Sequence, residues 1–167
     1  VKQTGAGSSY VDLAWDAQLG AGHYHTQFSQ DGKNWIDMDN SSSPSESVYN
    51  LTQGASYYAR VVAYKGSHYT GTHVMIGVSE TAIVSTKPTE VSGLTQTAAG
   101  VNSVSMSWNA SAGAASYVIY GYINYNWTQI GTSATNSATI TGVAATTSTR
   151  FSVAAVKNVT GGTVTGD

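Results

Sequence analysis

The sequence contains no cysteine and few charged residues. Of its 167 residues, 10% are Asp, Glu, Lys or Arg, and the formal net charge is −2. Without cysteine, the chain has neither a disulfide framework nor a thiolate metal site. The small and nearly balanced charge lacks the basic stripe by which proteins bind nucleic acid or an anionic membrane surface. We therefore expect neither of these partners.

Long apolar runs are also missing. No stretch approaches the ~18 consecutive apolar residues of a membrane span, and the first residues show no basic-then-apolar signal segment. Because the chain begins with Val1 and not with methionine, we expect it to be a mature or excised piece of a longer protein. Hydrophobic residues make up 41% of it, enough for a core, and its length suits one ordinary domain or two small ones of about 80–100 residues.

An internal repeat divides the sequence. The segment SYVDLAWDAQLGAGHY (9–24) aligns with SVSMSWNASAGAASY (103–117) at an offset of 93 residues. Beyond residue 34 the offset falls to 92, so the second copy lacks one residue in the intervening turn. Three aromatic pairs mark the alignment: Trp15 with Trp108, Tyr24 with Tyr117, and Trp35 with Trp127. A period near 90 residues is typical of tandem small domains rather than of a solenoid.

Both copies have the residue pattern of β-strands. YVDLAW and VSMSW alternate apolar and polar residues with period 2, as do ASYYARVVAY and STRFSVAAV. In YHTQFSQDGKNW, Asp31-Gly32 predicts a tight hairpin turn, because such turns need positive φ. No stretch shows a convincing helical period. About seven short strands per ~90 residues indicates an antiparallel β-sandwich with Greek-key connections.

These residues resemble fibronectin type III domains over nearly the whole chain. The second copy opens with Pro88 and the Gly-Leu of PTEVSGL, and the first copy carries LTQGASYY, which is similar to the family's run into strand F. The resemblance makes Tyr57 a tyrosine-corner residue, whose hydroxyl binds nearby backbone; Thr149 stands at this position in copy two. Six residues match structural positions of the family: Trp15, Tyr24, Leu51, Tyr57, Trp108 and Tyr117.

The predicted fold is thus all-β, with two tandem fibronectin type III-like (immunoglobulin-like) antiparallel β-sandwiches. We expect the first domain at 1–87, with the start of its first strand trimmed, and the second at 88–167, with its last strand missing. A missing last strand would leave the strand around 151–159 as an open edge, which native sheets avoid. Pro88 and the lack of a Gly/Ser stretch predict a semi-rigid joint.

The histidines are candidate metal ligands, because imidazole suits zinc, copper and nickel. All four lie in the first copy: His23, His25, His68 and His73. On the predicted strand C, the residues Tyr24, Thr26 and Phe28 should face the core, so that His23 and His25 point outward together. The competing interpretation is that they are solvated polar residues on an exposed sheet face. Copy two, which has no histidine, favours that interpretation.

Exposed aromatic residues are the second candidate site, since such rings stack on sugars or anchor protein partners. The candidates are Tyr58, Tyr64, Tyr69, Tyr120, Tyr122 and Trp127. Cross-strand packing explains aromatic residues on a sheet equally well.

No catalytic pattern is present in the sequence. There is no Gly-x-Ser-x-Gly elbow and no Gly-rich phosphate loop, and nothing places two carboxylates at glycosidase separation. We therefore expect a non-enzymatic spacer or adhesion module of a bacterial secreted or cell-surface multidomain protein, without a cofactor. Its partners would be neighbouring domains, with a polysaccharide or a surface protein as a further possibility. The open alternatives are a carbohydrate- or protein-binding module and a histidine-based metal-binding domain.

Overall fold

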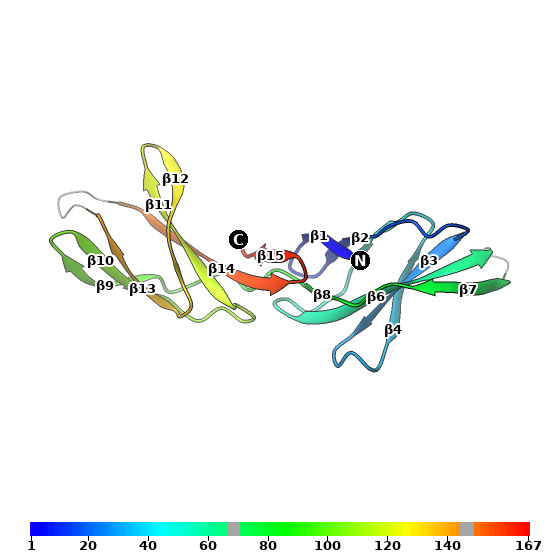
Figure 1. The fold of residues 1–167 in the computed structure, drawn as a ribbon. Coiled ribbons are helices and arrows are strands. Elements are labelled where there is room, and N and C mark those ends of the chain that lie inside the picture. Colours follow the sequence, from blue (N-terminus) through cyan, green and yellow to red (C-terminus); the bar gives the residue numbers. More distant parts are fainter. Residues whose placement is uncertain (67–70, 144–148) are drawn as a thin grey trace. The chain divides into compact units, whose positions relative to one another are not determined.

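The structure is a computed structural model that describes residues 1–66, 71–143 and 149–167. Every regular element in these ranges is a β-strand (Figure 1), which confirms the all-β prediction. Among the described residues, no helix is long and apolar enough to cross a membrane. The chain divides into two compact units: Val1–Lys87 with Asn158–Val164, and Pro88–Lys157 with Thr165–Asp167. The grouping of 158–164 with the first unit was not foreseen from the repeat.

The first unit contains two antiparallel sheets, one of three strands and one of five. The smaller sheet has the order β1-β2-β5, and the larger sheet has the order β4-β3-β6-β7, in which β8 also pairs with β6. The strands are β1 (Lys2–Ala6), β2 (Val11–Ala14), β3 (His23–Ser29), β4 (Ile36–Ser41), β5 (Ser45–Val48), β6 (Ser56–Gly66), β7 (His73–Val78) and β8 (Ala82–Ser85).

The second copy of the repeat forms sheets of three and four strands, although its residues 158–164 group with the first unit. Their orders are β13-β10-β9 and β12-β11-β14-β15. The strands are β9 (Thr95–Gly100), β10 (Ser103–Ser107), β11 (Ser116–Ile123), β12 (Asn126–Ser133), β13 (Ser137–Thr141), β14 (Phe151–Val159) and β15 (Gly162–Thr165). Because β15 pairs with β14, this strand is not an open edge where β15 lies beside it, and among the described residues no strand of the second copy corresponds to β8. The tight turn between them needs Gly161, whose φ is +82°.

The strand register explains the change of offset between the two copies. Tyr24 of β3 pairs with Ser41, whereas Tyr117 of β11 pairs with Ser133. The first residues of these pairs are 93 apart (117 − 24) and their partners 92 apart (133 − 41). The residue missing from copy two is therefore accommodated inside this hairpin, and the rest of the pairing is preserved.

A tryptophan–tyrosine pair lies in the core of each unit. The rings of Trp15 and Tyr24 are 5.5 Å apart at 66°, and those of Trp108 and Tyr117 are 5.3 Å apart at 68°, which is the favourable edge-to-face arrangement. Each tyrosine hydroxyl also accepts a hydrogen bond from a backbone N–H six residues earlier, at 3.0 Å. The donors are Gln18 and Ser111. This contact fastens the turn before β3 and before β11 onto the core.

Tyr57 provides a further backbone contact in the first unit alone. Its hydroxyl accepts a hydrogen bond from the Thr52 N–H at 3.0 Å, as the resemblance to fibronectin type III domains implies for a tyrosine corner. Tyr57 also packs beside Leu51 against the core of Val11, Leu13 and neighbouring residues. At the aligned position, Thr149 cannot make this contact, so the crossing into β14 lacks the corner hydroxyl.

Candidate functional site

The outward face of β3 carries the histidines, but it is not an exposed face. Tyr24, Thr26 and Phe28 point inward and are buried, as the alternation predicts. His23 on the opposite face is only 4% exposed. The interpretation of His23 as a solvated surface residue is therefore wrong. The sequence could not reveal this, because the rings that cover His23 come from distant strands.

A ring stack covers this face of β3, and we define it as His23, His25, Tyr64 and His73. Tyr64 pairs with His23 in the strand register, and their rings stack at 5.2 Å and 10°. His73 meets the edges of both of these rings, at 5.2 Å from His23 and 4.8 Å from Tyr64. His25 completes the group at 4.9 Å from Tyr64. The predicted convergence of histidines is thus present for these three.

Two histidine Nδ1 atoms of the ring stack contact oxygen atoms outside it. His23 Nδ1 is 3.2 Å from the Gly66 carbonyl oxygen, and His25 Nδ1 is 3.8 Å from Asp37 Oδ2. Within the described ranges, no group of three His, Cys, Asp or Glu residues has a geometry that could hold a metal ion. His68, the fourth candidate ligand, lies outside the described residues. The arrangement described here is one of packed rings.

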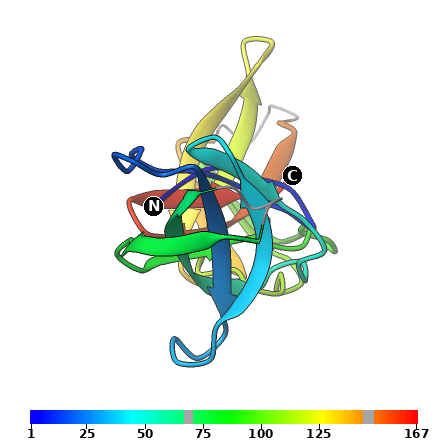
Figure 2. The same ribbon diagram turned by 90° about the vertical axis from the view of Figure 1, so that its right-hand side faces the viewer.

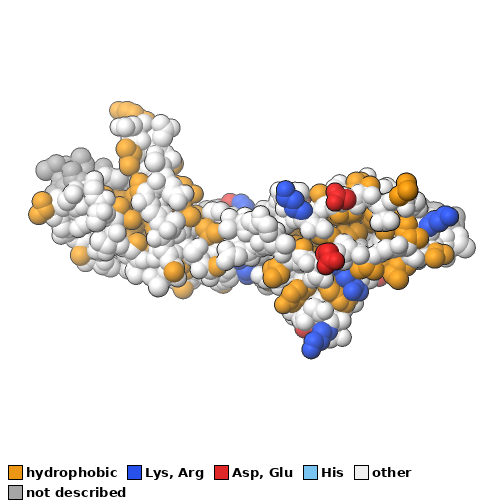
Figure 3. All heavy atoms as spheres, in the orientation of Figure 1, with side chains coloured by type: hydrophobic (Ala, Val, Ile, Leu, Met, Phe, Trp, Pro, Cys, Tyr) orange, Lys and Arg blue, Asp and Glu red, His pale blue; other side chains and the backbone are white. Residues whose placement is uncertain are grey.

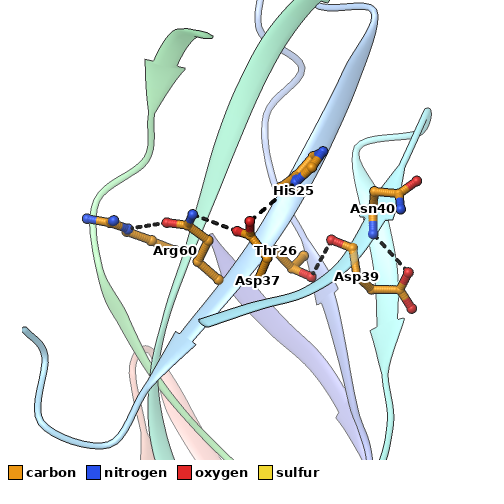
Figure 4. Close-up of polar contacts among 7 residues, drawn as sticks. His25, Thr26, Asp37, Asp39, Asn40 and Arg60 are labelled. Atoms are coloured by element: carbon orange, nitrogen blue, oxygen red, sulfur yellow. Dashed lines mark hydrogen bonds and ion pairs between the residues drawn. The ribbon is translucent and has the colours of Figure 1, made fainter. Parts of the chain in front are cut away.

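A chain of polar contacts runs across β6, β3 and β4 next to the ring stack (Figure 4). Arg60 Nε donates to Gln27 Oε1 at 2.8 Å, and Gln27 Nε2 donates to Asp37 Oδ1 at 2.6 Å. Asp37 then reaches His25 with its second oxygen. The Arg60 guanidinium also lies 4.0 Å from the centre of the Trp35 ring, a cation–π contact. The polar side chains of this face are therefore linked to one another in a continuous chain of contacts.

The loop around Asp31 differs from the tight turn that the sequence predicts. The hairpin exists and Gly32 has φ of +71°, but β3 ends at Ser29 and β4 begins only at Ile36. Asp31 Oδ1 accepts hydrogen bonds from the backbone N–H groups of Asn34 and Lys33, each at 2.8 Å. These donors, with the Ser29 hydroxyl and the Asn34 amide, hold the pKa of Asp31 well below its usual range. The carboxylate thus organises a wider loop.

A pocket of about 490 Å³ opens beside this loop. Its walls are mainly apolar and include Phe28 and Leu51 of the core, while Asn34 and Asn50 lie among its polar lining. The remaining lining residues are Ser29, Gln30, Asp31, Ile36, Met38 and Tyr57. Its volume is that of a small-molecule site. Sequence reasoning missed it because its residues come from three separate segments, with no local motif.

The aromatic candidates are divided between the two units. Tyr58 is exposed and pairs with Ser29 near one end of β6, whereas Tyr64 lies in the ring stack. Tyr120 is half-buried on β11, and Tyr69 lies outside the described residues. Among the candidates that the structure describes, only Tyr122 and Trp127 come together: they pair across the β11–β12 hairpin with ring centres 5.3 Å apart at 60°. Both are exposed.

The strand order of each unit defines the class of fold. A three-stranded sheet packs on a larger sheet whose inner pair is β3 with β6 in the first copy and β11 with β14 in the second, with the core between the sheets, as in fibronectin type III sandwiches. The chain is a tandem of two such fibronectin type III-like sandwiches. No protein-family model matches the sequence, and a search of curated proteins finds no match.

Solved structures of tandem fibronectin type III domains are similar to this chain. A two-domain segment of chicken tenascin matches over 99% of this chain and 94% of its own, with 18% identity and a TM-score of 0.46. The FN1–FN3 segment of chicken CNTN1 matches over 98% of this chain, with 14% identity and a TM-score of 0.49. This chain spans 65% of that second segment. At such identities the likeness concerns the fold alone.

Proposed function

We propose that this chain is a non-catalytic module of a larger secreted or cell-surface protein, in which it acts as a spacer or adhesion segment. The observation that carries this proposal is the pair of tryptophan–tyrosine contacts in the two cores. Both copies keep the ring pair and the hydroxyl–backbone hydrogen bond at 3.0 Å, although their surfaces differ in charge and in loop structure. Both copies thus retain the core contacts that stabilise the sandwich while their surfaces differ, which favours a role that depends on the shape of the two sandwiches.

The groups on the sheet face of the first unit support the same proposal. The polar side chains Arg60, Gln27 and Asp37 are bonded to one another, and the ring stack is packed rather than open. Such groups stabilise a sheet surface. Fold alone leaves many roles open for this sandwich, so the proposal needs a functional test.

The test is an exchange within the longer protein that we infer. One version has residues 1–167 deleted, and another has them replaced by two sandwiches of equal length and unrelated surface. A spacer predicts that deletion impairs the longer protein and that the replacement restores it. If the replacement fails as deletion does, a specific surface of this chain is needed and the spacer proposal is wrong.

The location has its own test. Intact cells that produce the longer protein are treated with an external protease, and fragments of this chain are then identified in the supernatant by mass spectrometry. A secreted or surface module is released or cut without lysis, while a cytoplasmic protein included as a control stays intact. Cleavage that occurs only after lysis would contradict the location that we propose.

The runner-up function is that of a carbohydrate- or protein-binding module. The exposed pair of Tyr122 and Trp127 is the observation that favours it. Binding of the chain to a glycan array that is lost in Trp127→Ala and kept in Tyr58→Ala would support this alternative, since Tyr58 is exposed on the other unit.

A further inference from the structure

The β11–β12 hairpin ends in a tip of apolar and aromatic side chains. We define the β11–β12 tip as residues 122–127, YINYNW. Both ribbon views show the hairpin standing out from the rest of its own unit (Figures 1 and 2). In the space-filling view, hydrophobic side chains lie along it up to the end, and no charged side chain lies on its visible face (Figure 3). The tip therefore presents apolar surface on a convex projection.

The turn at the end of this hairpin has an unusual residue in a costly conformation. Ile123 pairs with Asn126, so Asn124 and Tyr125 form a two-residue loop, with φ of +49° and +66°. Asparagine tolerates positive φ, but the second position of such a turn strongly favours glycine. For tyrosine the left-handed conformation is unfavourable, and Tyr125 as a residue is 90% exposed, so packing within the unit does not explain this residue.

The exposed area of the tip is too small for a stable protein interface. Tyr122 is 38% exposed, Ile123 44% and Trp127 51%. With Tyr125, these side chains present about 300–500 Å², if a full aromatic side chain contributes about 150–250 Å². A stable protein–protein interface needs about 800 Å² from each partner. The partner therefore has to accept a small convex tip.

The charge and geometry of the tip point to a lipid surface. Residues 91–149 contain no Asp, Glu, Lys, Arg or His, so insertion of the tip buries no charge. The Tyr122 and Trp127 rings are inclined at 60° and do not form the flat platform on which a sugar chain stacks. Tyrosine and tryptophan prefer the headgroup level of a bilayer, which suits the paired Tyr122 and Trp127 rings behind the turn.

The turn also limits the cost of removing its backbone from water. Asn126 Nδ2 donates to the Asn124 carbonyl oxygen at 3.2 Å, and β11 and β12 pair up to Ile123 and Asn126. An unsatisfied backbone group costs several kcal/mol in an apolar medium. The side chain that follows the turn thus satisfies one of the groups that insertion would otherwise leave without a partner.

We propose that the β11–β12 tip docks by shallow insertion into the interface of an uncharged or zwitterionic lipid bilayer. Tyr125 and Ile123 enter the boundary between headgroups and acyl chains, and Tyr122 and Trp127 lie at headgroup level. This is an interfacial contact and not a membrane span. This proposal does not depend on the spacer role: the exchange experiment measures the function of the longer protein, whereas the vesicle experiment measures lipid binding by this chain.

The experiment is co-sedimentation of the whole chain with phosphatidylcholine vesicles. We expect binding that changes less than twofold between low and high salt, because no charge lies in the tip. Tyr125→Asn and Tyr125→Gly should each weaken binding at least tenfold, while both keep or raise the thermal stability, because they relieve the positive φ of tyrosine. This opposite response of binding and stability separates loss of the ring from misfolding.

Val101 provides the matched control. It is 89% exposed at the turn between β9 and β10 of the same unit, and Val101→Ser should bind vesicles as the parent chain does. Failure of the parent chain to bind, or equal loss in Val101→Ser, would overturn the proposal. Retention by a neutral polysaccharide without vesicle binding would overturn it in favour of a glycan site. Dimerisation that Tyr125→Asn abolishes, again without vesicle binding, would point to self-association instead.

Discussion

Removal of the tyrosine hydroxyl from the two cores should have unequal costs. Tyr24→Phe and Tyr117→Phe delete the same hydrogen bond, which is 3.0 Å long in both units. The donors differ, however: Gln18 is exposed, whereas Ser111 is buried. In Tyr24→Phe, water can replace the lost acceptor. In Tyr117→Phe, the Ser111 N–H is left buried without this partner.

The expected magnitudes follow from this difference. Loss of an ordinary hydrogen bond costs about 0.5–1.5 kcal/mol, and a buried group left unsatisfied costs about 1–3 kcal/mol. We therefore expect Tyr117→Phe to lower the free energy of unfolding of its unit by about 1–3 kcal/mol and Tyr24→Phe by about 0.5–1.5 kcal/mol. Because 1 kcal/mol shifts the melting temperature of a small domain by about 4–8 °C, the difference is measurable.

The assay is urea unfolding followed by hydrogen exchange and mass spectrometry, which reports on peptides from each unit separately. Tyr57→Phe is the control: its donor, Thr52, is exposed, so its cost should match that of Tyr24→Phe. Equal costs for Tyr24→Phe and Tyr117→Phe, or a larger cost for Tyr24→Phe, would refute the argument from burial.

Three further predictions concern the first unit. The pKa of Asp31 is lowered in the folded state, so its carboxylate stabilises the fold at pH values above the unfolded pKa of about 3.9, and this stabilisation is lost as the pH falls towards the folded pKa. Between about pH 4 and 2, the wild type should therefore lose stability more steeply than Asp31→Asn in urea unfolding. Parallel curves would contradict this. Gly66 has φ of +98°, and a Cβ atom at this position would meet the Thr72 carbonyl oxygen. Gly66→Ala should therefore lower the free energy of unfolding by at least about 1–2 kcal/mol, measured by urea unfolding. An unchanged urea midpoint would count against this. His23→Ala should cost about 1–3 kcal/mol for the lost stacking and hydrogen bond, and a chelator should leave the wild-type melting curve unchanged; a chelator-dependent fall would instead support a metal in the ring stack.

Much of the fold could be predicted from local patterns. Successive side chains of a strand point to opposite sides. The alternation along β3 therefore places Tyr24 and Phe28 on the same face, toward the core. The repeat of Trp15 and Tyr24 as Trp108 and Tyr117 likewise predicts two cores of one type. These inferences need only neighbouring residues or two copies of one pattern.

The conformations of the loops could not be predicted in the same way. Asp31-Gly32 correctly predicts a hairpin, but the side chain of Asp31 competes for backbone donors and opens the loop. The turn at Asn124 and Tyr125 carried no glycine signal, yet the pairing of β11 with β12 imposes positive φ on both residues. At Asp31 a local side-chain contact decided the backbone, and at Asn124 and Tyr125 the pairing of the two strands did.

The sequence by itself determined the strand pattern, the two copies, the tryptophan–tyrosine pairs and the lack of charge between residues 91 and 149. Only the tertiary structure decided that His23 is buried under Tyr64 and His73, that a pocket lies beside Asp31, and that the β11–β12 tip is exposed. The physical reason is that the direction of a side chain follows from the two-residue period of its own strand, which is local. The residues that cover that side chain depend instead on the register between strands separated by tens of residues, which no local pattern encodes.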